Sequence, residues 1–457
     1  MSIATINPAT GKTVREFPAL TPAELDARIQ KAHRAAREWR RAPLTERTAA
    51  VGRIGDLLLE RQAKYAELMT LEMGKPIRAA REEVAKCADA CHYFAANAVR
   101  FLEPQLLDLK GEPARVEFHP IGVVLAVMPW NFPFWQVIRF AAPALCAGNA
   151  GLLKHASNVP QCALALEEVA RDAGVPEGVF QTLLVGSDAV DGIIADARVA
   201  AVTLTGSNAA GEAVGARAGR SIKKSVLELG GSDPFIVMPS ADVKAAAATA
   251  VKARAINNGQ SCIAAKRFIV ATEIYDAFLE QFVAGMRALR VGDPTKDDTD
   301  MGPLATRSIR DELHSQVERS VAAGARVIVG GKPVAGPGWF YQPTVLVDAP
   351  AGAPVLTEET FGPVAVVIRA RDADDVVRIA NDSPFGLGSS AWTRDPAEAR
   401  RLATDIEAGT VVINGMMASD SRLPFGGVKQ SGYGRELSDF GLREFVNIKT
   451  IRGLASP

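Results

Sequence analysis

The sequence predicts an α/β protein built on two parallel sheets. Short apolar runs alternate with helical patterns from residue 121 onwards, an order typical of a Rossmann-type parallel sheet. A second alternating series begins near Asp233. The chain has 457 residues, of which 48% are hydrophobic, so it can bury a large core. Its length suggests about three domains.

The first hundred residues are predicted to be mainly helical. Thr21-Pro22-Ala23-Glu24 has the pattern of a capping box with proline at the first helical position. Segments rich in Ala, Leu, Glu and Arg follow until about Leu102, and breaks are expected near Pro43 and Pro76.

A small additional sheet is expected from two segments that lie far apart in the sequence. Residues 106–120 contain Gly111-Glu112-Pro113 as a turn, followed by alternating Val116 and Phe118, which predicts a hairpin. Residues 445–451 are apolar and strand-like but too short to stand alone. Such a tail usually pairs with another sheet, in its own chain or in a partner subunit.

The two α/β series are defined by their alternating segments. In the first, we expect strands at 123–127, 151–154, 180–185, 200–204 and 225–229, with helices at 161–173 and 209–218. In the second, we expect strands at 234–238, 267–271, 326–329 and 364–369, with helices at 243–256, 274–289, 308–323 and 373–380.

Composition excludes several classes of function. Lys+Arg and Asp+Glu both number 52, so nothing favours nucleic-acid binding. The first eight residues lack a signal-peptide pattern, and no apolar run approaches the roughly 20 residues that span a bilayer. Five scattered cysteines predict a reducing, cytoplasmic location. Cys87, Cys91 and His92 fall on one helical pattern without a second ligand pair, so we expect no metal site.

Cys262 is the candidate nucleophile. It ends Asn258-Gly259-Gln260-Ser261-Cys262, a small polar turn between two helix-like segments. A thiolate nucleophile needs an open approach and a nearby base. Most free cysteines are simply buried small side chains, which is the alternative interpretation of Cys262.

Two further residues are candidates for the same chemistry. Glu228 precedes Gly230-Gly231, where the chain can pass close to a ligand, although a lone glutamate at a strand end is usually solvated. Asn131 lies in Pro129-Trp130-Asn131-Phe132-Pro133, and a side-chain amide held by flanking prolines can donate to an oxyanion. Asparagine in a loop is more often an ordinary turn former.

Together with Glu358-Glu359-Thr360-Phe361-Gly362-Pro363, these segments resemble the NAD(P)-dependent aldehyde dehydrogenase superfamily. The resemblance implies that Cys262 attacks the aldehyde carbon, giving a thiohemiacetal and then a thioester. It implies that Glu228 is the general base that activates the hydrolytic water. It also implies that Asn131 and the backbone N–H of Cys262 stabilise the oxyanion.

The resemblance also implies a nicotinamide cofactor. Gly206 and Ser207 follow a strand and open a helix, where backbone N–H groups suit a phosphate. The other cofactor-binding residues implied are Trp130, Lys154 at the adenosine ribose, Glu359 at the nicotinamide ribose and Phe361 beside the nicotinamide. Ser157 stands where NAD-preferring relatives often carry Glu, so the sequence admits NADP without excluding NAD.

Arg139 is the clue to the substrate. Most arginines lie at the surface, but Arg139 falls on an apolar segment, where a buried guanidinium needs an anion. Succinate-semialdehyde dehydrogenases carry Arg at the matching place and a Ser that matches Ser419, and Trp135 could form an apolar wall. The whole chain resembles the short bacterial members of that sub-group, which implies oxidation of succinate semialdehyde to succinate.

The resemblance further implies a division of the chain and an assembly. We expect a cofactor-binding domain over 1–105 and 122–229, a catalytic domain over 230–425, and bridging or oligomerisation segments at 106–121 and 440–457. The expected assembly is a homodimer or homotetramer.

Several alternatives remain open at this point. Another carboxylated or aliphatic aldehyde is the nearest, and a CoA-acylating dehydrogenase is disfavoured by Glu228. A cysteine-dependent esterase or thioesterase, or a non-catalytic binding protein on the same scaffold, would belong to other classes.

Overall fold

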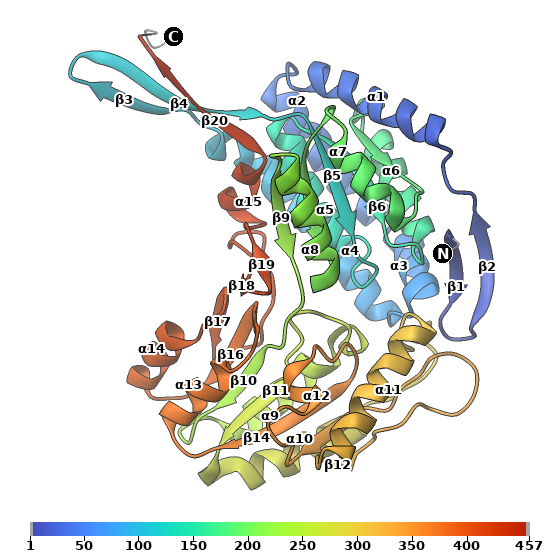
Figure 1. Cartoon of the computed structure of the whole chain (residues 1–457), viewed down its shortest axis with the longest axis vertical. Coiled ribbons are helices and arrows are strands. Elements are labelled where there is room, and N and C mark those ends of the chain that lie inside the picture. Colours follow the sequence, from blue (N-terminus) through green and yellow to red (C-terminus); the bar gives the residue numbers. More distant parts are fainter. Residues whose placement is uncertain (1–2, 454–457) are drawn as a thin grey trace.

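The structure, a computed structural model, describes residues 3–453. Two helix-flanked sheets form separate bodies, and a long hairpin projects from the one that contains the N-terminal helices (Figure 1). The residues outside this range are 1–2, which belong to the predicted cofactor-binding segment, and 454–457, which belong to the predicted 440–457 segment. No helix among residues 3–453 is long and apolar enough to cross a membrane.

The N-terminal region follows the predicted pattern of helices and breaks. The capping box is confirmed, since the hydroxyl of Thr21 accepts from the backbone N–H of Glu24 at 3.3 Å and the Glu24 carboxylate accepts from the N–H of Thr21 at 2.8 Å. Pro43 and Pro76 stand directly before the second and fourth helices. The helices are α1 (Pro22–Trp39), α2 (Leu44–Glu60), α3 (Gln62–Met73) and α4 (Ile77–Phe101). An antiparallel pair, β1 (Ile3–Asn7) and β2 (Lys12–Phe17), precedes them and was not predicted.

The first sheet has the strand order β19-β9-β8-β5-β6-β7. The strands β5 to β9 run parallel to one another. Its parallel strands are β5 (Val123–Met128), β6 (Ala150–His155), β7 (Phe180–Thr182), β8 (Val199–Thr205) and β9 (Lys224–Glu228). The edge strand β19 (Gly432–Tyr433) runs antiparallel to β9. The predicted strand 180–185 is wrong beyond Thr182, because the chain leaves the sheet there.

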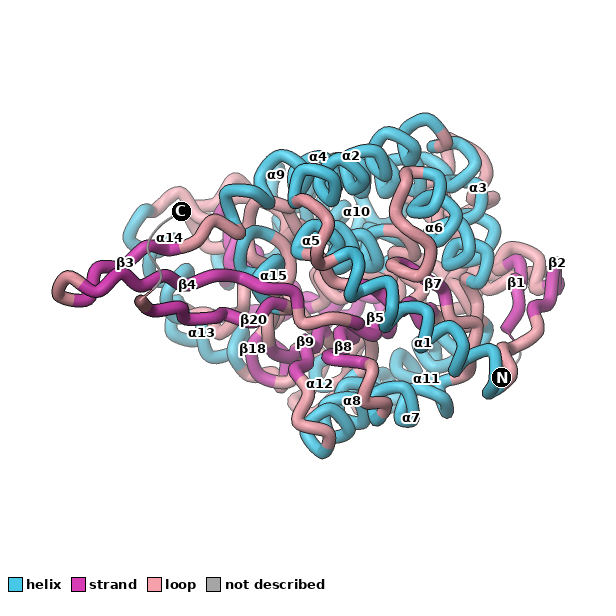
Figure 2. The backbone as a smooth tube through the Cα atoms, turned by 90° about the horizontal axis from the view of Figure 1, so that it is seen from above, coloured by secondary structure: helices cyan, strands magenta, loops and turns pink. Residues whose placement is uncertain are grey.

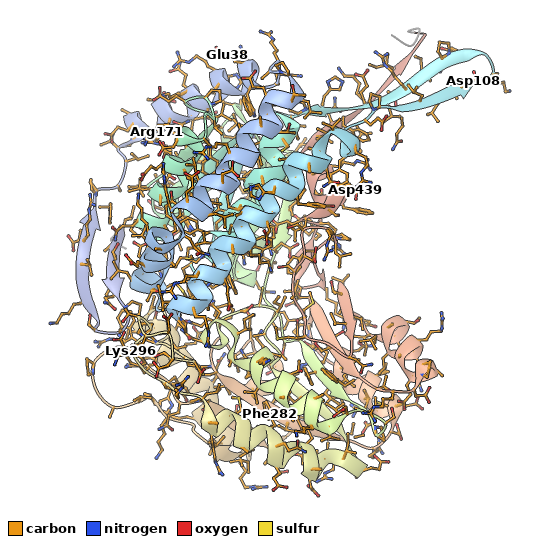
Figure 3. The ribbon with its side chains drawn as sticks, turned by 180° about the vertical axis from the view of Figure 1, so that it is seen from behind. Glu38, Asp108, Arg171, Phe282, Lys296 and Asp439 are labelled. Atoms are coloured by element: carbon orange, nitrogen blue, oxygen red, sulfur yellow. The ribbon has the colours of Figure 1, made fainter. Side chains whose placement is uncertain are left out.

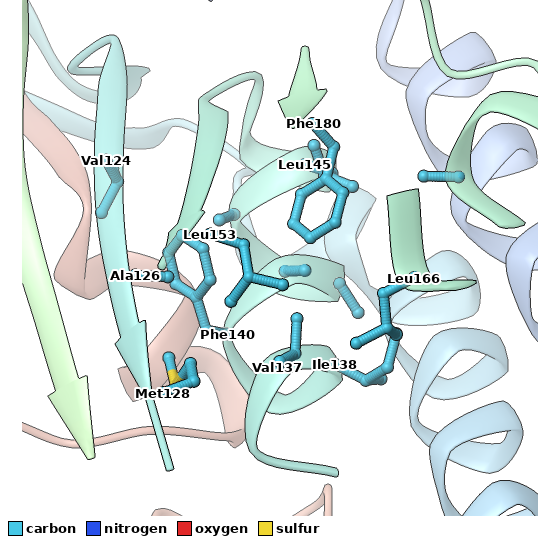
Figure 4. Packing of buried hydrophobic residues seen from close by; sticks show 14 of the residues in the cluster. Val124, Ala126, Met128, Val137, Ile138, Phe140, Leu145, Leu153, Leu166 and Phe180 are labelled. Carbon is cyan, nitrogen blue, oxygen red and sulfur yellow. The ribbon is translucent and has the colours of Figure 1, made fainter. Parts of the chain in front are cut away.

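The helices α5 (Trp135–Ala147), α6 (Pro160–Asp172), α7 (Val190–Ala195) and α8 (Asn208–Arg220) accompany this sheet. Every residue of α5 is buried. Figure 4 shows Val137, Ile138 and Phe140 of this helix packed beside Ala126 and Leu153 of the neighbouring strands. A helix enclosed on all sides therefore carries any polar side chain into the interior.

The second sheet has the order β12-β13-β14-β11-β10-β16-β17, parallel except for β12. Its strands are β10 (Pro234–Val237), β11 (Arg267–Ala271), β12 (Arg326–Val329), β13 (Thr344–Val347), β14 (Val364–Ala370), β16 (Gly388–Trp392) and β17 (Thr410–Ile413). The helices of this body are α9 (Val243–Ala255), α10 (Tyr275–Ala288), α11 (Arg307–Ala322), α12 (Pro354–Thr357), α13 (Ala373–Asn381) and α14 (Pro396–Asp405). Strands β13, β16 and β17 were not predicted. A short pair, β15 (Phe385–Gly386) and β18 (Val428–Lys429), lies between the bodies.

The small third sheet forms within the chain. β20 (Val446–Arg452) pairs antiparallel with β4 (Glu112–Pro120), which pairs with β3 (Gln105–Leu109). The helix α15 (Ser438–Glu444) leads into β20. The predicted turn is displaced, because Pro113 already pairs with Asp108 and the positive φ angles fall at Lys110 and Gly111. Figure 2 shows this hairpin extending from the body, and Figure 3 places Asp108 on it, far from Phe282 of α10.

Candidate active site

Strand register brings the predicted site residues of the first sheet to one edge. Val127 of β5 lies opposite Lys154 of β6 and Leu204 of β8, while Thr205 lies opposite Glu228 of β9. The loops that follow these strands therefore leave the sheet side by side. They carry Trp130, Asn131, Ser157, Gly206 and Ser207.

The strand order reverses at the boundary between β5 and β8. From β5 the chain builds outward to β6 and β7, and then returns to place β8 and β9 on the other side. Open α/β sheets bind ligands at this kind of switch point, in a crevice beyond the carboxyl ends of the strands. A pocket of about 420 Å³ lies there, lined among others by Trp130, Asn131, Gly206, Ser207, Cys262, Glu359 and Phe361.

The N-terminus of α8 opens beside this pocket. The hydroxyl of Ser207 caps the helix by accepting from the N–H of Ala210 at 3.3 Å. The remaining N–H groups of the first turn and the positive end of the helix dipole favour an anion. Gly206 leaves the approach unobstructed, because a Cβ there would meet no atom closer than 3.6 Å.

Lys154 and its neighbours complete the same edge. Lys154 is buried, and burial lowers its pKa, an effect that Asp188 partly offsets. Within residues 3–453 it has no ion-pair partner, so its cation can serve a ribose or a phosphate. His155 accepts from the N–H of Ala156 at 2.9 Å, and its Nε2 donates to the carbonyl of Pro133 at 2.9 Å. This contact holds the end of the loop that carries Trp130 and Asn131.

The loop before Cys262 has an unusual backbone. Asn257, Asn258 and Gly259 have φ angles of 54°, 60° and 75°, so three successive residues are left-handed. Asparagine and glycine are the residues that adopt this conformation most readily. At Gly259 a Cβ would lie 2.3 Å from the carbonyl carbon of Gly362, so no other residue fits without displacement. The turn thus explains the polar, glycine-containing sequence before the cysteine.

Hydrogen bonds join this loop to the loop that carries Asn131. The amide of Asn257 donates to the carbonyls of Asn131 at 2.7 Å and Gln260 at 2.9 Å. The amide of Asn131 donates to the same carbonyl of Gln260 at 3.2 Å. Asn131 is 4% exposed, and it lines the same pocket as Cys262. One of its two amide hydrogens remains free for a ligand.

A buried lysine, Lys266, binds the backbone carbonyl groups at Cys262. The ammonium of Lys266 donates to the carbonyls of Ser261 at 3.0 Å and Cys262 at 2.8 Å. It also lies 3.5 Å from the carboxylate of Glu359, which accepts from the N–H of Gly231 at 2.9 Å. Lys266 therefore links the predicted nucleophile to the predicted ribose-binding glutamate, and nothing in the sequence pattern had marked it.

The surroundings of Cys262 favour its protonated form. Burial raises its pKa to about 12, and the charge of Glu359 adds to the rise, while Lys266 and Arg139 oppose it. A proton must therefore leave Cys262 before its sulfur can attack.

Glu228 is more deeply buried than a solvated strand-end residue. It is 2% exposed, and neither carboxylate oxygen has a hydrogen-bond partner among residues 3–453. Burial raises its pKa well above the usual value; Glu436 adds to the rise, while Arg139 and Arg435 oppose it. This arrangement favours the protonated form of Glu228, which is not among the residues that line either pocket.

A second pocket, of about 170 Å³, meets the first at Cys262. Its lining includes all three residues predicted to bind substrate, which are Trp135, Arg139 and Ser419. Lys86, Ser261, Cys262 and Phe425 also line it. The nucleophile thus stands where a pocket at the sheet edge and a pocket among helices converge.

Arg139 is not a surface residue. It is 2% exposed, forms an ion pair with Glu436, and donates to the hydroxyl of Thr205 at 3.3 Å. Its guanidinium also stacks over the ring of Phe425, 4.6 Å from the centroid. Arg139 therefore lines the pocket with its charge already matched by a protein carboxylate.

Sequence reasoning missed two charged residues here. Lys86 of α4 donates to the hydroxyl of Ser419 at 2.9 Å, and its ammonium lies 4.3 Å from the ring centroid of Trp135. In the sequence it is one lysine in a charged helical segment and has no distinguishing pattern. Glu436 follows a glycine-rich run at 426–434, the only local signal that could have pointed to it.

Comparison with known proteins agrees with this geometry. Residues 1–451 match the aldehyde dehydrogenase family. The chain is 58% identical over 454 residues to succinate-semialdehyde dehydrogenase (NADP+) 1 of Mycobacterium tuberculosis, and the match covers 99% of each protein. A protein of the same name from Mycobacterium ulcerans is 57% identical over 455 residues, covering 99% of each.

A solved structure extends the agreement to three dimensions. The succinic semialdehyde dehydrogenase of Streptococcus pyogenes, crystallised in complex with NADP+ as the cofactor, is 36% identical and superposes with a TM-score of 0.96. The match covers 98% of this chain and 99% of that one. The sequence identity and the shared architecture establish that this chain belongs to the aldehyde dehydrogenase family.

Proposed function

We propose that this protein oxidises succinate semialdehyde to succinate with NAD(P)+, and the names of its relatives favour NADP+. The observation that carries the proposal is the position of Cys262, shared by a pocket suited to a nucleotide and a pocket with a cationic end. The mycobacterial and streptococcal relatives bear the corresponding name.

In this proposal Cys262 gives its proton to solvent water, and its Sγ bonds to the aldehyde carbon while the C=O π bond opens, which leaves an oxyanion. The amide of Asn131 and the backbone N–H of Cys262 donate to that oxyanion, whose stabilisation is often the largest catalytic contribution. A nicotinamide cofactor held along the sheet edge would supply the hydride acceptor for the same carbon, and Cys262 would then carry a thioester. Water attacks the thioester, the C–S bond breaks, and the acid leaves with the thiol restored.

Glu228 is the proposed general base for the attacking water. Because burial raises its pKa and so favours the protonated form, Glu228 acts as a base only in the molecules in which it is ionised. Glu436 and Arg139, which act on it electrostatically, are therefore expected to influence the rate of thioester hydrolysis.

The proposed cofactor site lies along the sheet edge. The residues at that edge fit a dinucleotide, because a free helix N-terminus, a buried lysine and an apolar wall converge there. Gly206 and Ser207 would hold the pyrophosphate, and Lys154 and Ser157 the adenosine ribose. Ser157 carries no negative charge to oppose a 2′-phosphate. Glu359, Trp130 and Phe361 would enclose the nicotinamide end.

The proposed substrate site is the smaller pocket. Trp135, Arg139 and Ser419 stand among its walls, and Cys262 borders it. A four-carbon semialdehyde has its reacting carbonyl and its carboxylate at opposite ends. The carbonyl would face Cys262 while the carboxylate lies toward the charged wall.

The organisation of the protein is also a proposal. We propose a cofactor-binding domain formed by residues 1–105 and 122–229, a catalytic domain over 230–425, and bridging segments at 106–121 and 440–457. The proposed assembly is a cytoplasmic homodimer or homotetramer. Exposed Leu106, Leu107 and Leu109 on the projecting hairpin support an assembly, because such a row of leucines favours burial against another subunit.

The test is the formation of reduced nicotinamide, followed by absorbance, with succinate semialdehyde and butanal and with each cofactor. We expect kcat/KM to be highest for succinate semialdehyde with NADP+. Equal values for the two aldehydes would reduce the function to that of a general aldehyde dehydrogenase. Thioester hydrolysis without any aldehyde oxidation would instead indicate a cysteine-dependent hydrolase.

A further inference from the structure

We propose that Lys86 is the specificity-determining cation that binds the distal carboxylate of the substrate, with Ser419 as its neighbour, and that Arg139 is a positioning residue. This inference rests on the proposed function and sharpens it, because it moves the anionic anchor from α5 to α4. Both residues border the pocket that ends at Cys262.

The side chain of Lys86 is preorganised to bind a ligand. Its ammonium donates to the hydroxyl of Ser419 at 2.9 Å and lies over the ring of Trp135 at 4.3 Å. These two contacts hold the long side chain in one place, so little conformational freedom is lost when a ligand binds. An ammonium has three hydrogens, and the contact with Ser419 uses only one of them.

Two of the other charges that line this pocket are paired cations, whereas the exposed carboxylate of Glu82 on α4 forms no ion pair within residues 3–453. Arg139 forms its ion pair with Glu436, and both are buried. Lys75 and Glu83 form a second buried pair behind Phe132.

Asp420, which acts on Lys86 from the loop beside Ser419, is bound by Arg422 at 2.6 Å. Across the described chain, Lys86 makes no ion pair with any carboxylate. Among the cations that line the pocket in residues 3–453, Lys86 is therefore the one without a carboxylate partner.

An uncompensated charge in a secluded site favours an anionic ligand. Burial, together with the positive charge of Arg139, lowers the pKa of Lys86 to about 8, although Cys87, Glu83 and Asp420 oppose the shift. A substrate carboxylate would relieve that penalty at Lys86. At Arg139 it would have to compete with Glu436, or share the guanidinium with it.

Lys86→Met tests the inference, because methionine keeps an unbranched side chain over Trp135 and removes only the charge. The measurement is the ratio of kcat/KM for succinate semialdehyde to that for butanal, with NADP+ and the full-length enzyme. We expect Lys86→Met to lower this ratio roughly tenfold to a hundredfold, the usual effect of losing a hydrogen bond to a charged group. Oxidation of butanal should continue, which also shows that the variant is folded.

Two further variants serve as controls. Lys86→Arg keeps the positive charge and should retain most of the parent ratio. Lys64→Met removes an exposed lysine of α3 that pairs with Glu168 at 3.0 Å, outside the pocket, and should leave the ratio unchanged.

Arg139→Met provides the contrast. Because it strands Glu436 in the interior without a partner, it should impair both aldehydes together. An unaltered ratio in Lys86→Met, with a collapsed ratio in Arg139→Met, would overturn the inference and return the carboxylate to Arg139. Equal losses on both aldehydes in Lys86→Met, not restored by arginine, would also overturn it. A parent enzyme without preference for succinate semialdehyde would instead refute the proposed function.

Discussion

The two pockets that meet at Cys262 are lined by different kinds of groups. The larger one, of about 420 Å³, lies where parallel strands end and a helix begins, so its polar groups are largely backbone N–H groups and loop residues. The smaller one, of about 170 Å³, is enclosed by side chains from α4, α5 and the loop near Ser419. The first is a property of the fold, whereas the second is a property of particular side chains.

This difference has a consequence for specificity. A site made of backbone donors persists when side chains change, because the strand order and the helix terminus position it. A site made of buried side-chain charges changes its ligand when one of those charges is removed or paired. We therefore expect substitution of Lys86 in the smaller pocket to alter the choice of aldehyde, and substitution of Ser157 at the sheet edge to alter the choice of cofactor.

The largest effect is expected where the pockets join. Cys262→Ala should abolish oxidation of succinate semialdehyde and butanal alike, because it removes the atom that bonds to either substrate. Binding of NADP+, followed by the fluorescence of Trp130 and the other tryptophans, should persist. Cys146→Ala, in the buried helix α5, is the matched control and should remain active. Oxidation near the parent rate in Cys262→Ala would exclude the covalent mechanism.

Asn131→Ala should produce the next largest effect. Loss of one oxyanion donor typically lowers kcat by about 10²–10³, and the loss should be similar for both aldehydes. The backbone carbonyl of Asn131, which receives the amide of Asn257, is unchanged in this variant, so the loop keeps that contact. A rise in KM with unchanged kcat would show that Asn131 binds ground state and transition state equally.

Ser157→Glu should affect only the cofactor side. A carboxylate there opposes the 2′-phosphate, and a like-charge contact costs enough to lower the NADP/NAD ratio of kcat/KM by about tenfold or more. The preference between succinate semialdehyde and butanal should stay the same. Ser157→Ala serves as the uncharged control. An unaltered cofactor ratio would mean that position 157 does not face the ribose.

The smallest effect is expected from pH and should appear only on the substrate side. Lys86, with its pKa of about 8, is charged below that pH and neutral above it. The succinate semialdehyde to butanal ratio of kcat/KM, which reports the free enzyme, should therefore fall by up to about tenfold from pH 7 to pH 9. Ionisation of Cys262 affects both aldehydes and cancels in the ratio.

Lys86→Arg is the control for this profile, since arginine stays charged throughout the range. The groups that act on Lys86 are Arg139 from α5, Glu83 and Cys87 from α4, and Asp420 from its loop. An equally steep fall in Lys86→Arg would show that another of these groups controls the ratio.

Much of the fold was predictable because its strands are short apolar runs between helices. β5, β8 and β11 appear where the alternation places them. β2 was missed because five of its six residues are exposed and lack an apolar pattern. β16 was missed for the opposite reason, since its Gly-Ser-Ser-Ala-Trp sequence is fully buried yet largely small and polar.

The residues of the site also divide into those that the sequence predicts and those that it does not. Trp130, Asn131, Gly206 and Ser207 stand together because they follow strands of one parallel sheet, whose strand ends meet at one edge, and Cys262, Glu359 and Phe361 come to the same pocket on loops of the second body. Their chemistry is therefore contained in local patterns. Roles for these residues stay predictions until the variants above are measured.

Charge pairing in the smaller pocket could not be predicted in this way. Lys86 and Ser419 are 333 positions apart, and Arg139 and Glu436 are nearly as distant in the chain. Whether a buried cation is free for a ligand or matched by a protein carboxylate depends on which distant segment packs against it. Periodicity reports which face of a helix is buried, but the partner of each buried charge is set by long-range packing, because electrostatic contacts act through space rather than along the chain.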